Sequence, residues 1–326
     1  MANVLITGGA GYIGSHACKL LSASGFVPVT IDNLSTGWDN AVRYGPIEVG
    51  DLRDKLFLEH VFRKYKPESV VHFAAASQVG ESTVNPGFYW NNNVLGSLNL
   101  IETAVQNECL KFVFSSTCAV YGEQSSHVLD EECETNPMNA YAASKLAVEH
   151  MLENFRKSHK IQYVTFRYFN VAGADPEAEI GEKHIPETHI VPLLLDVALG
   201  KRDAFTVYGT DYSTSDGTCI RDYVHVCDIV DAHLKGLTLM ERENFSYTFN
   251  LGTGVGFSVR EVIEAVRNVT GKAVNIIDGD RRAGDCTKLV SGSNLAQTTL
   301  NWRPQRSNLD KMVSDAFEWH RKLYLK

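Results

Sequence analysis

The stretch that decides the fold is Val4-Leu5-Ile6-Thr7-Gly8-Gly9-Ala10-Gly11-Tyr12-Ile13-Gly14, a short apolar strand that runs into a glycine-rich turn. The residues after it form one apolar face at helical spacing, made of Ile13, Ala17, Leu20 and Leu21. The glycines fit both Gly9-x-Gly11-x-x-Gly14 and Gly8-x-x-Gly11-x-x-Gly14. Small residues in such a turn let the backbone approach a pyrophosphate at a helix N-terminus. The stretch therefore predicts a dinucleotide-binding turn.

A carboxylate closes the next apolar strand, Val27 to Ile31. Asp32 follows Gly14 by 18 residues (32 − 14 = 18). This is near the roughly 20 residues expected for an acid that binds the adenine ribose. Asp32 would repel a 2′-phosphate, and the segment from Asn33 to Gly37 contains no Arg or Lys to hold one. We therefore expect the cofactor to be NAD rather than NADP.

Strand-like runs alternate with helical patterns over the first half of the chain. The helical patterns include Leu56 to Lys66 and Val94 to Asn107. The expected strands are Val4 to Ile6, Val27 to Ile31, Ile47 to Val49, Ser69 to Phe73, Phe112 to Ser115 and Tyr163 to Phe169. Such alternation predicts an α/β fold with a Rossmann-type, doubly wound parallel sheet. We expect an NAD-binding domain over 1–172, to which segments around 222–250 return, and a smaller C-terminal substrate-binding lobe over 173–326.

Open parallel sheets bind ligands at the carboxyl ends of their strands, so the residues at those ends are candidate cofactor contacts. Asp51 is suited to accept from an adenine amino group while Leu52 packs on the ring. Further strand-end candidates are Phe73, Ala74, Ala75, the Ser115-Ser116-Thr117 run and Asn170. A hydroxyl of that run would lie at the height of the nicotinamide.

The bulk properties exclude several classes of function. A net charge of −8 argues against broad binding to nucleic acid or to anionic membranes. The first strand begins near Val4, which leaves no room for a signal peptide, and we find no apolar run of membrane-spanning length. The seven cysteines are scattered without a Cys-x-x-Cys pair, so we expect reduced thiols, no metal site and a cytoplasmic protein.

Tyr141-Ala-Ala-Ser-Lys145 places a phenol and an ammonium four residues apart, on one face of an expected helix. A phenolate base that works near neutral pH needs a pKa lowered by roughly 3 units, or about 4 kcal/mol. One cation about 6 Å away in an effective dielectric of about 20 supplies roughly 3 kcal/mol. A lysine together with the positive ring of an oxidised nicotinamide could supply the whole shift.

A second glycine-rich run, Asn250 to Gly256, follows an expected strand over Tyr247 to Phe249. It precedes Ser258-Val-Arg-Glu261, which has the form of a capping box. Because no acid follows in the right register, we expect a turn here rather than a second nucleotide site.

Taken together, the motifs resemble the extended short-chain dehydrogenase/reductase family, and within it the UDP-sugar 4-epimerases. The resemblance covers essentially the whole chain. The motifs that carry it are Thr-Gly-Gly-Ala-Gly-Tyr-Ile-Gly at 7–14, Phe-Ser-Ser-Thr at 114–117, Tyr141-x-x-x-Lys145, Arg167-Tyr-Phe-Asn170 and Arg221-Asp-Tyr-Val-His225. It implies interconversion of UDP-glucose and UDP-galactose through a 4-keto intermediate, with bound NAD as transient hydride acceptor. It also implies a homodimer paired through the helices around Val94 to Asn107 and Tyr141 to Phe155.

The resemblance further implies roles for individual residues. Tyr141 would be the catalytic base, Lys145 would hold the nicotinamide ribose and lower the tyrosine pKa, and Thr117 would face the reacting sugar oxygen. The implied cofactor contacts are Gly8, Gly11, Tyr12, Ile13, Gly14, Asp32, Asn33, Asp51, Leu52, Phe73, Ala74, Ala75, Asn93, Ser115, Tyr141, Lys145 and Tyr168. The implied substrate contacts are Thr117, Tyr141, Asn170, His189, Arg221, Arg282, Asp285 and Leu289. Among these, Arg221 and Arg282 would bind the pyrophosphate.

Three positions depart from the better-known pattern of the family. His189 stands where many relatives have Asn, and Ser77 stands where some carry a lysine. Leu289 stands where a tyrosine or a small residue bounds the sugar pocket. The identity of the preferred sugar is therefore the least determined part of the prediction.

Three other functions stay open. The enzyme could be a 4-epimerase for a UDP-pentose or an N-acetylated hexose, or a nucleotide-sugar reductase or dehydrogenase, which would use Tyr141 and Lys145 equally well. A non-catalytic NAD-binding regulator is a further alternative. A 4,6-dehydratase is disfavoured, because it needs an acid/base pair where this chain has Cys118 and Ala119.

Overall fold

A computed structural model describes residues 1–124, 128–242, 244–282 and 285–324. Its strands are β1 (Asn3–Thr7), β2 (Val27–Asp32), β3 (Ile47–Val49), β4 (Ser69–His72), β5 (Lys111–Thr117), β6 (Gln162–Tyr168), β7 (Asn170–Ala172), β8 (Phe205–Tyr208), β9 (Ile220–His225), β10 (Tyr247–Leu251), β11 (Gly256–Ser258), β12 (Ile276–Gly279) and β13 (Lys288–Leu289).

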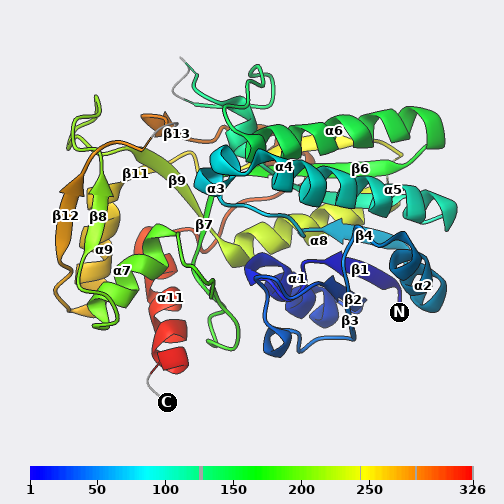
Figure 1. Ribbon diagram of the computed structural model, residues 1–326, viewed down its shortest axis with the longest axis horizontal. Coiled ribbons are helices and arrows are strands. Elements are labelled where there is room, and N and C mark those ends of the chain that lie inside the picture. Colours follow the sequence, from blue (N-terminus) through cyan, green and yellow to red (C-terminus); the bar gives the residue numbers. More distant parts are fainter. Residues whose placement is uncertain (125–127, 243, 283–284, 325–326) are drawn as a thin grey trace. The chain divides into compact units, whose positions relative to one another are not determined.

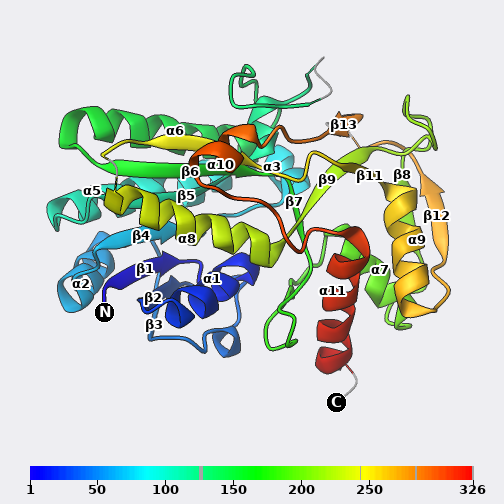
Figure 2. The ribbon, with the colours of Figure 1, turned by 180° about the vertical axis from the view of Figure 1, so that it is seen from behind.

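The α-helices, labelled in Figures 1 and 2 where there is room, are α1 (Tyr12–Ala23), α2 (Lys55–Tyr65), α3 (Val79–Val84), α4 (Pro86–Tyr89), α5 (Gly96–Gln106), α6 (Ala140–His159), α7 (Ile190–Ala198), α8 (Val226–Arg242), α9 (Val259–Thr270), α10 (Asn294–Thr299) and α11 (Leu309–Tyr324). Shorter helical turns are η1 (Asp39–Ala41), η2 (Trp90–Leu95) and η3 (Cys118–Tyr121).

Two compact units divide the chain. The first comprises Met1–Gly122, Glu134–Arg167 and Val230–Phe249, and the second comprises Glu123–Cys133, Tyr168–Ile229 and Asn250–Lys326. The chain thus passes between the units several times. The assignment of NAD to one unit and of the substrate to the other stays a prediction.

A seven-stranded sheet in the order β10-β6-β5-β4-β1-β2-β3 is the centre of the first unit. The pairs β1–β2, β1–β4, β2–β3 and β4–β5 are parallel. This confirms the α/β, Rossmann-type sheet predicted from the sequence. The fifth strand extends further than the expected Phe112 to Ser115, because Ser116 and Thr117 also belong to β5.

Helices cover both faces of this sheet (Figures 1 and 2). On one face, Val29 and Ile31 of β2 belong to an apolar core with residues of α2, α5 and α6, among them Phe62, Leu100 and Leu152. Side chains alternate along a strand, so Thr30 points to the other face. There its hydroxyl lies 3.5 Å from the thiol of Cys18 in α1. Alternate residues of β2 thus contact helices on opposite faces of the sheet, and the contact with Cys18 places α1 on the second face.

The helix expected from Val94 begins later than predicted. Residues Trp90–Leu95 form a π-helical turn, and α5 starts at Gly96. The turn directs Asn93 into the interior. There its side-chain amide accepts a hydrogen bond from the Ala76 N–H at 2.8 Å and donates to the Ala76 carbonyl and the Ser144 hydroxyl, each at 3.0 Å. Single π-turns inside helices often occur at functional sites, and this one presents a predicted cofactor residue.

The second unit is built around β9, which pairs with β11, β13 and β7. Its apolar core joins α7, α9 and α11, with Leu194, Val266 and Met312 fully buried. Asp222 of β9 accepts hydrogen bonds from the backbone of Thr253 and Gly254, so the second glycine-rich run is a turn held by a carboxylate. The capping box expected from Ser258 to Glu261 is present at the start of α9 and is confirmed.

Among the described residues, no helix combines the length and the apolar character needed to cross a membrane.

Candidate active site

The glycine turn leaves space that larger residues would fill. Gly8 has φ +73°, and a Cβ added to it would lie 2.8 Å from the backbone nitrogen of Ala74. A Cβ on Gly14 would lie 2.1 Å from the Gly8 carbonyl oxygen. Helix α1 starts at Tyr12, and no described side chain caps its first turn. A helix N-terminus without a side-chain cap beside a glycine turn fits a pyrophosphate.

Asp32 is the last residue of β2 and is largely buried. Its carboxylate accepts from the backbone N–H of Ala10, at 3.0 Å, and of Leu34, at 2.9 Å. Burial raises the pKa of Asp32 above its ordinary value, while these two hydrogen bonds oppose the rise. The acid is thereby fixed beside the glycine turn, where the sequence predicts contact with a ribose.

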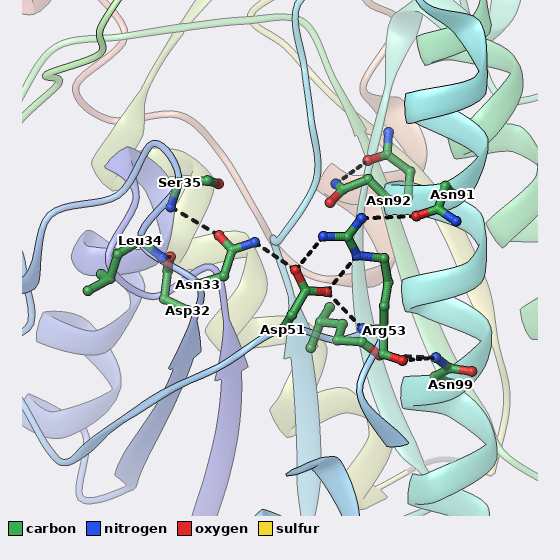
Figure 3. Close-up of polar contacts among 11 residues, drawn as sticks. Asp32, Asn33, Leu34, Ser35, Asp51, Arg53, Asn91, Asn92 and Asn99 are labelled. Atoms are coloured by element: carbon green, nitrogen blue, oxygen red, sulfur yellow. Dashed lines mark hydrogen bonds and ion pairs between the residues drawn. The ribbon is translucent and has the colours of Figure 1, made fainter. Parts of the chain in front are cut away.

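Asp51 belongs to a polar network at the carboxyl end of β3 (Figure 3). Arg53 contacts both of its oxygens, at 2.8 and 2.7 Å, and Asn33 donates to it at 3.1 Å. The guanidinium of Arg53 lowers the pKa of Asp51 well below its usual range. Arg53 also donates to Asn91 at 2.9 Å. Arg53 was not among the predicted site residues; Asp51 neutralises its charge, and Arg53 links Asp51 to Asn91.

The segment after β4 lies against β1. The backbone N–H groups of Phe73 and Ala74 donate to the Thr7 carbonyl, at 3.1 and 3.2 Å. Phe73 packs on the ring of His233 with centroids 4.8 Å apart. Phe73, Ala74 and Ala75 are partly exposed, so this strand end stays accessible, as does Leu52 after β3.

Tyr141 and Lys145 lie in the first two turns of α6, which Asn139 caps by accepting from the Ala142 N–H at 2.9 Å. Lys145 is 4% exposed. Its ammonium donates to the Ser115 carbonyl at 2.8 Å and lies 5.0 Å from the centroid of the Phe114 ring. Burial lowers the pKa of Lys145 to about 7, although Glu149 acts in the opposite direction. Tyr141 is partly exposed and packs edge-on against Tyr89.

The hydroxyls at the end of β5 have different partners. Ser115 Oγ lies 3.0 Å from Nε2 of His233, so its hydroxyl is engaged in the interior. The Ser116 hydroxyl donates to Glu149. Thr117 Oγ1 accepts from the Ala119 N–H at 3.2 Å, which leaves its O–H free to rotate toward another acceptor.

Glu149 and Arg167 form a buried ion pair beneath these hydroxyls. Arg167 reaches the carboxylate of Glu149 with contacts of 2.6 to 3.2 Å and donates to the Tyr121 hydroxyl at 3.1 Å. Glu149 lies one helical turn after Lys145. Arg167 was predicted only as part of a sequence motif, and Glu149 was not among the predicted site residues. Its spacing of four from Lys145 was the available signal.

In the second unit, four predicted substrate residues lie on or near β9 and β8. Arg221 is mostly buried, donates to the carbonyls of Ile220 and Cys286 at 2.9 and 2.8 Å, and lies 3.6 Å from Asp285. Leu289 pairs with Arg221 in the parallel register of β13 and β9. Arg282 stacks on the Tyr208 ring at 3.9 Å. A guanidinium fork, a carboxylate and an apolar side chain are thus brought together.

The remaining candidates of the second unit lie elsewhere on it. Tyr168 ends β6 and Asn170 begins β7, and both are partly exposed. His189 immediately precedes α7, and its Nδ1 lies 2.5 Å from Glu182. The Glu182 carboxylate raises the pKa of His189. One edge of the His189 ring is therefore engaged with an acid, and the sequence analysis missed that acid.

The parallel sheet and the glycine turn are those of a dinucleotide-binding α/β protein. The family model described as "NAD dependent epimerase/dehydratase family" matches residues 4–252. The chain belongs to this family.

Individual relatives are similar over nearly the full length. UDP-glucose 4-epimerase of Rhizobium meliloti is 45% identical over 318 residues, which cover 98% of this chain and 97% of the relative. The crystal structure of UDP-glucose 4-epimerase from Brucella ovis in complex with NAD superposes with a TM-score of 0.95 at 42% identity, over 98% of each chain. That of the Bifidobacterium longum enzyme in complex with NAD+ and UDP has a TM-score of 0.94 at 31% identity, also over 98% of each chain.

Proposed function

We propose that this protein is an NAD-dependent UDP-glucose 4-epimerase, which interconverts UDP-glucose and UDP-galactose. The observation that carries the proposal is the pair formed by Tyr141 and the buried Lys145, on a helix anchored to the end of β5. The full-length similarity to UDP-glucose 4-epimerases supports the same reaction. NAD, when bound, supplies the acceptor and donor of the hydride at C4 of the sugar.

The glycine turn and the strand ends of the first unit would hold NAD. The spaces at Gly8 and Gly14 suit a pyrophosphate, and Asp32 suits a ribose that carries no 2′-phosphate. The proposed contacts are Gly8, Gly11, Tyr12, Ile13, Gly14, Asp32, Asn33, Asp51, Leu52, Phe73, Ala74, Ala75, Asn93, Ser115, Tyr141, Lys145 and Tyr168.

Tyr141 would accept the proton of the sugar 4-hydroxyl and later return it. Its position in the first turn of a 20-residue helix places the positive end of the helix dipole beside the phenolate. A protonated Lys145 one turn further stabilises the same negative charge. Thr117, whose hydroxyl hydrogen is free to rotate, would donate to the sugar oxygen.

Residues of the second unit would bind the UDP moiety. Arg221 and Arg282 carry the guanidinium groups that suit a pyrophosphate. Asp285 suits the hydroxyls of the uridine ribose, while Asn170 and His189 offer further polar contacts. Leu289, which pairs with Arg221 along the strand, would border the sugar.

The preferred sugar distinguishes this function from its alternatives. Purified protein is given UDP-galactose, UDP-N-acetylgalactosamine and UDP-pentoses in turn, and the products are identified by chromatography. We expect conversion of UDP-galactose to UDP-glucose without net change in NADH absorbance. Accumulation of NADH would indicate a dehydrogenase, and bound NAD without turnover of any sugar would indicate a regulator.

Two further properties belong to this proposal. We infer a homodimer from the apolar side chains exposed on η2 beside α5, Trp90 and Leu95, and sedimentation of the purified protein tests it. We also infer a cytoplasmic location, because all seven cysteines are free thiols.

A further inference from the structure

We propose that the segment from Glu182 to His189 binds one divalent transition-metal ion through four side chains, those of Glu182, His184, Glu187 and His189. One donor atom from each residue lies within 4.8 Å of the donors of the other three. The segment joins β7 to α7 in the second unit. The site shares no residue with the Tyr141–Lys145 pair, and one of its residues, His189, is also a proposed contact for the UDP moiety.

The distances between the donors match a tetrahedral ligand shell. With Zn–N and Zn–O bonds of about 2.0 to 2.1 Å, neighbouring ligand atoms of a tetrahedral zinc site lie about 3.3 Å apart. Nδ1 of His184 lies 3.2 Å from Glu182 and 3.7 Å from Glu187. Nδ1 of His189 lies 2.5 Å from Glu182 and 3.6 Å from Glu187. If each of these donor–donor distances became slightly shorter or longer, the four donors would enclose one ion.

The nitrogens of the two imidazole rings converge on one point. Both Nδ1 atoms point at the same oxygen of Glu182, and the imidazole centroids are 5.5 Å apart. Both ring nitrogens can ligate one metal ion at this spacing. Glu182 is only 4% exposed, so its negative charge needs a compensating positive charge nearby.

The chemistry of the donors selects the class of metal. Two imidazole nitrogens and two carboxylate oxygens suit Zn²⁺ and similar first-row ions. Ca²⁺ and Mg²⁺ prefer six or more oxygen ligands, which two carboxylates do not provide. The nearby group of Asp175, Glu177 and Glu179 offers oxygens only and therefore serves as an internal comparison.

Surrounding contacts orient the carboxylates. The Glu187 side chain accepts from the backbone N–H groups of Thr188 and His189, at 2.8 and 2.9 Å. The main-chain carbonyl of Glu182 accepts from the indole of Trp319 in α11 at 2.9 Å. His189 occupies the N-cap position of α7, without a capping bond from its side chain. A bound ion would thus connect the loop after β7 to the start of α7.

The test measures metal binding by the full-length protein after dialysis against EDTA. Zn²⁺ is titrated calorimetrically against the wild type, His184→Gln, His189→Gln and the double variant. Loss of a residue that only supports a metal ligand typically lowers metal affinity roughly 10- to 100-fold. Loss of a direct ligand should therefore weaken binding at least about tenfold. Stoichiometric binding by the wild type and loss of that site in the double variant are expected.

Matched controls separate the site from other zinc-binding groups. His60→Gln on α2 and Glu177→Gln in the oxygen-only group should bind Zn²⁺ like the wild type. His184→Cys keeps a zinc-binding donor, and with Co²⁺ it should show a thiolate charge-transfer absorption that His184→Gln lacks. Each variant is first checked for a wild-type circular dichroism spectrum.

Two results would overturn the proposal. One is a wild-type protein that takes up no more Zn²⁺ than the double variant. The other is a His184→Cys variant whose Co²⁺ complex shows no thiolate absorption although the protein is folded. Either result would mean that the four side chains form only an ion-paired cluster.

Discussion

Tyr141 is the residue on which the proposed chemistry depends most directly. Removal of its hydroxyl takes away the general base but leaves the aromatic ring and its edge-on contact with Tyr89. Tyr141→Phe should therefore lower the turnover of UDP-galactose at least about a hundredfold, while the protein still binds NAD. Tyr163→Phe, which loses a hydrogen bond to Glu153 on the outer part of α6, is the matched control. Near-normal turnover by Tyr141→Phe would remove this tyrosine from the mechanism.

The buried ammonium of Lys145 should make stability depend on pH. Its pKa is lowered from 10.5 to about 7 in the folded protein because burial disfavours the charged form. Between these values the unfolded chain binds more protons than the folded one, so the lysine favours folding increasingly as pH rises. The stability of NAD-free wild type relative to Lys145→Met should rise between about pH 7 and 10.5, by at most about 1.4 kcal/mol per unit.

Urea unfolding at several pH values measures this dependence. The matched control is Lys157→Met at an exposed position of the same helix, and its stability relative to wild type should not vary in this way. A relative stability of Lys145→Met that stays constant over the range would show that Lys145 keeps an ordinary pKa.

Leu289 is expected to limit the size of the group at C2 of the sugar. An N-acetyl group needs more room than a hydroxyl, so UDP-galactose should be the better substrate of the wild type. Leu289→Ser should raise the activity on UDP-N-acetylgalactosamine relative to UDP-galactose. One steric contact discriminates by about 1 to 3 kcal/mol, so the ratio of kcat/KM values should change tenfold or more. Leu295→Ser on α10 is the control and should leave the ratio unchanged. An unchanged ratio in Leu289→Ser would show that another residue limits the size of the group at C2.

At the scale of elements, the buried pair of Glu149 and Arg167 links α6 to β6, and Ser116 extends the link to β5. Removal of one partner leaves an uncompensated buried charge, which costs about 3 to 5 kcal/mol. Glu149→Leu should therefore destabilise the protein strongly in denaturant unfolding. The double variant Glu149→Leu/Arg167→Met should recover much of the loss, because apolar residues of similar volume replace both charges.

The exposed pair Glu153–Arg156 on the same helix provides the comparison. Solvent screens such a pair, so Arg156→Met should leave the unfolding midpoint almost unchanged. Equal losses for Glu149→Leu and Arg156→Met would mean that the interior pair does not hold these elements together.

At the scale of the whole molecule, the features that depend on local sequence were predictable. The parallel strands follow from apolar runs between turns, and their observed bounds differ from the predicted ones by about one or two residues. The glycine turn and the Ser258–Glu261 capping box are also local, because every contacting residue lies within a few positions along the chain.

Features that depend on distant partners could not be predicted in this way. Periodicity gives no sign that η2 widens into a π-turn, which is stabilised by bonds from Asn93 to Ala76 and Ser144. The partners Glu149 and Arg167 are 18 residues apart and meet only when α6 packs on the sheet. The Glu-x-His-x-x-Glu-x-His spacing from Glu182 to His189 was visible in the sequence. The prediction that the protein has no metal site rested on cysteine spacing alone and took no account of these histidines.

The central claim is that epimerisation proceeds by removal and return of a hydride at C4, with Tyr141 moving only the hydroxyl proton. The most direct test is conversion of UDP-galactose by the purified protein in D2O, followed by proton NMR. A hydride retained within the active site does not exchange with solvent, so UDP-glucose should form with its C4 hydrogen undiluted by deuterium. Deuterium at C4 of the product, or no formation of UDP-glucose, would contradict the account.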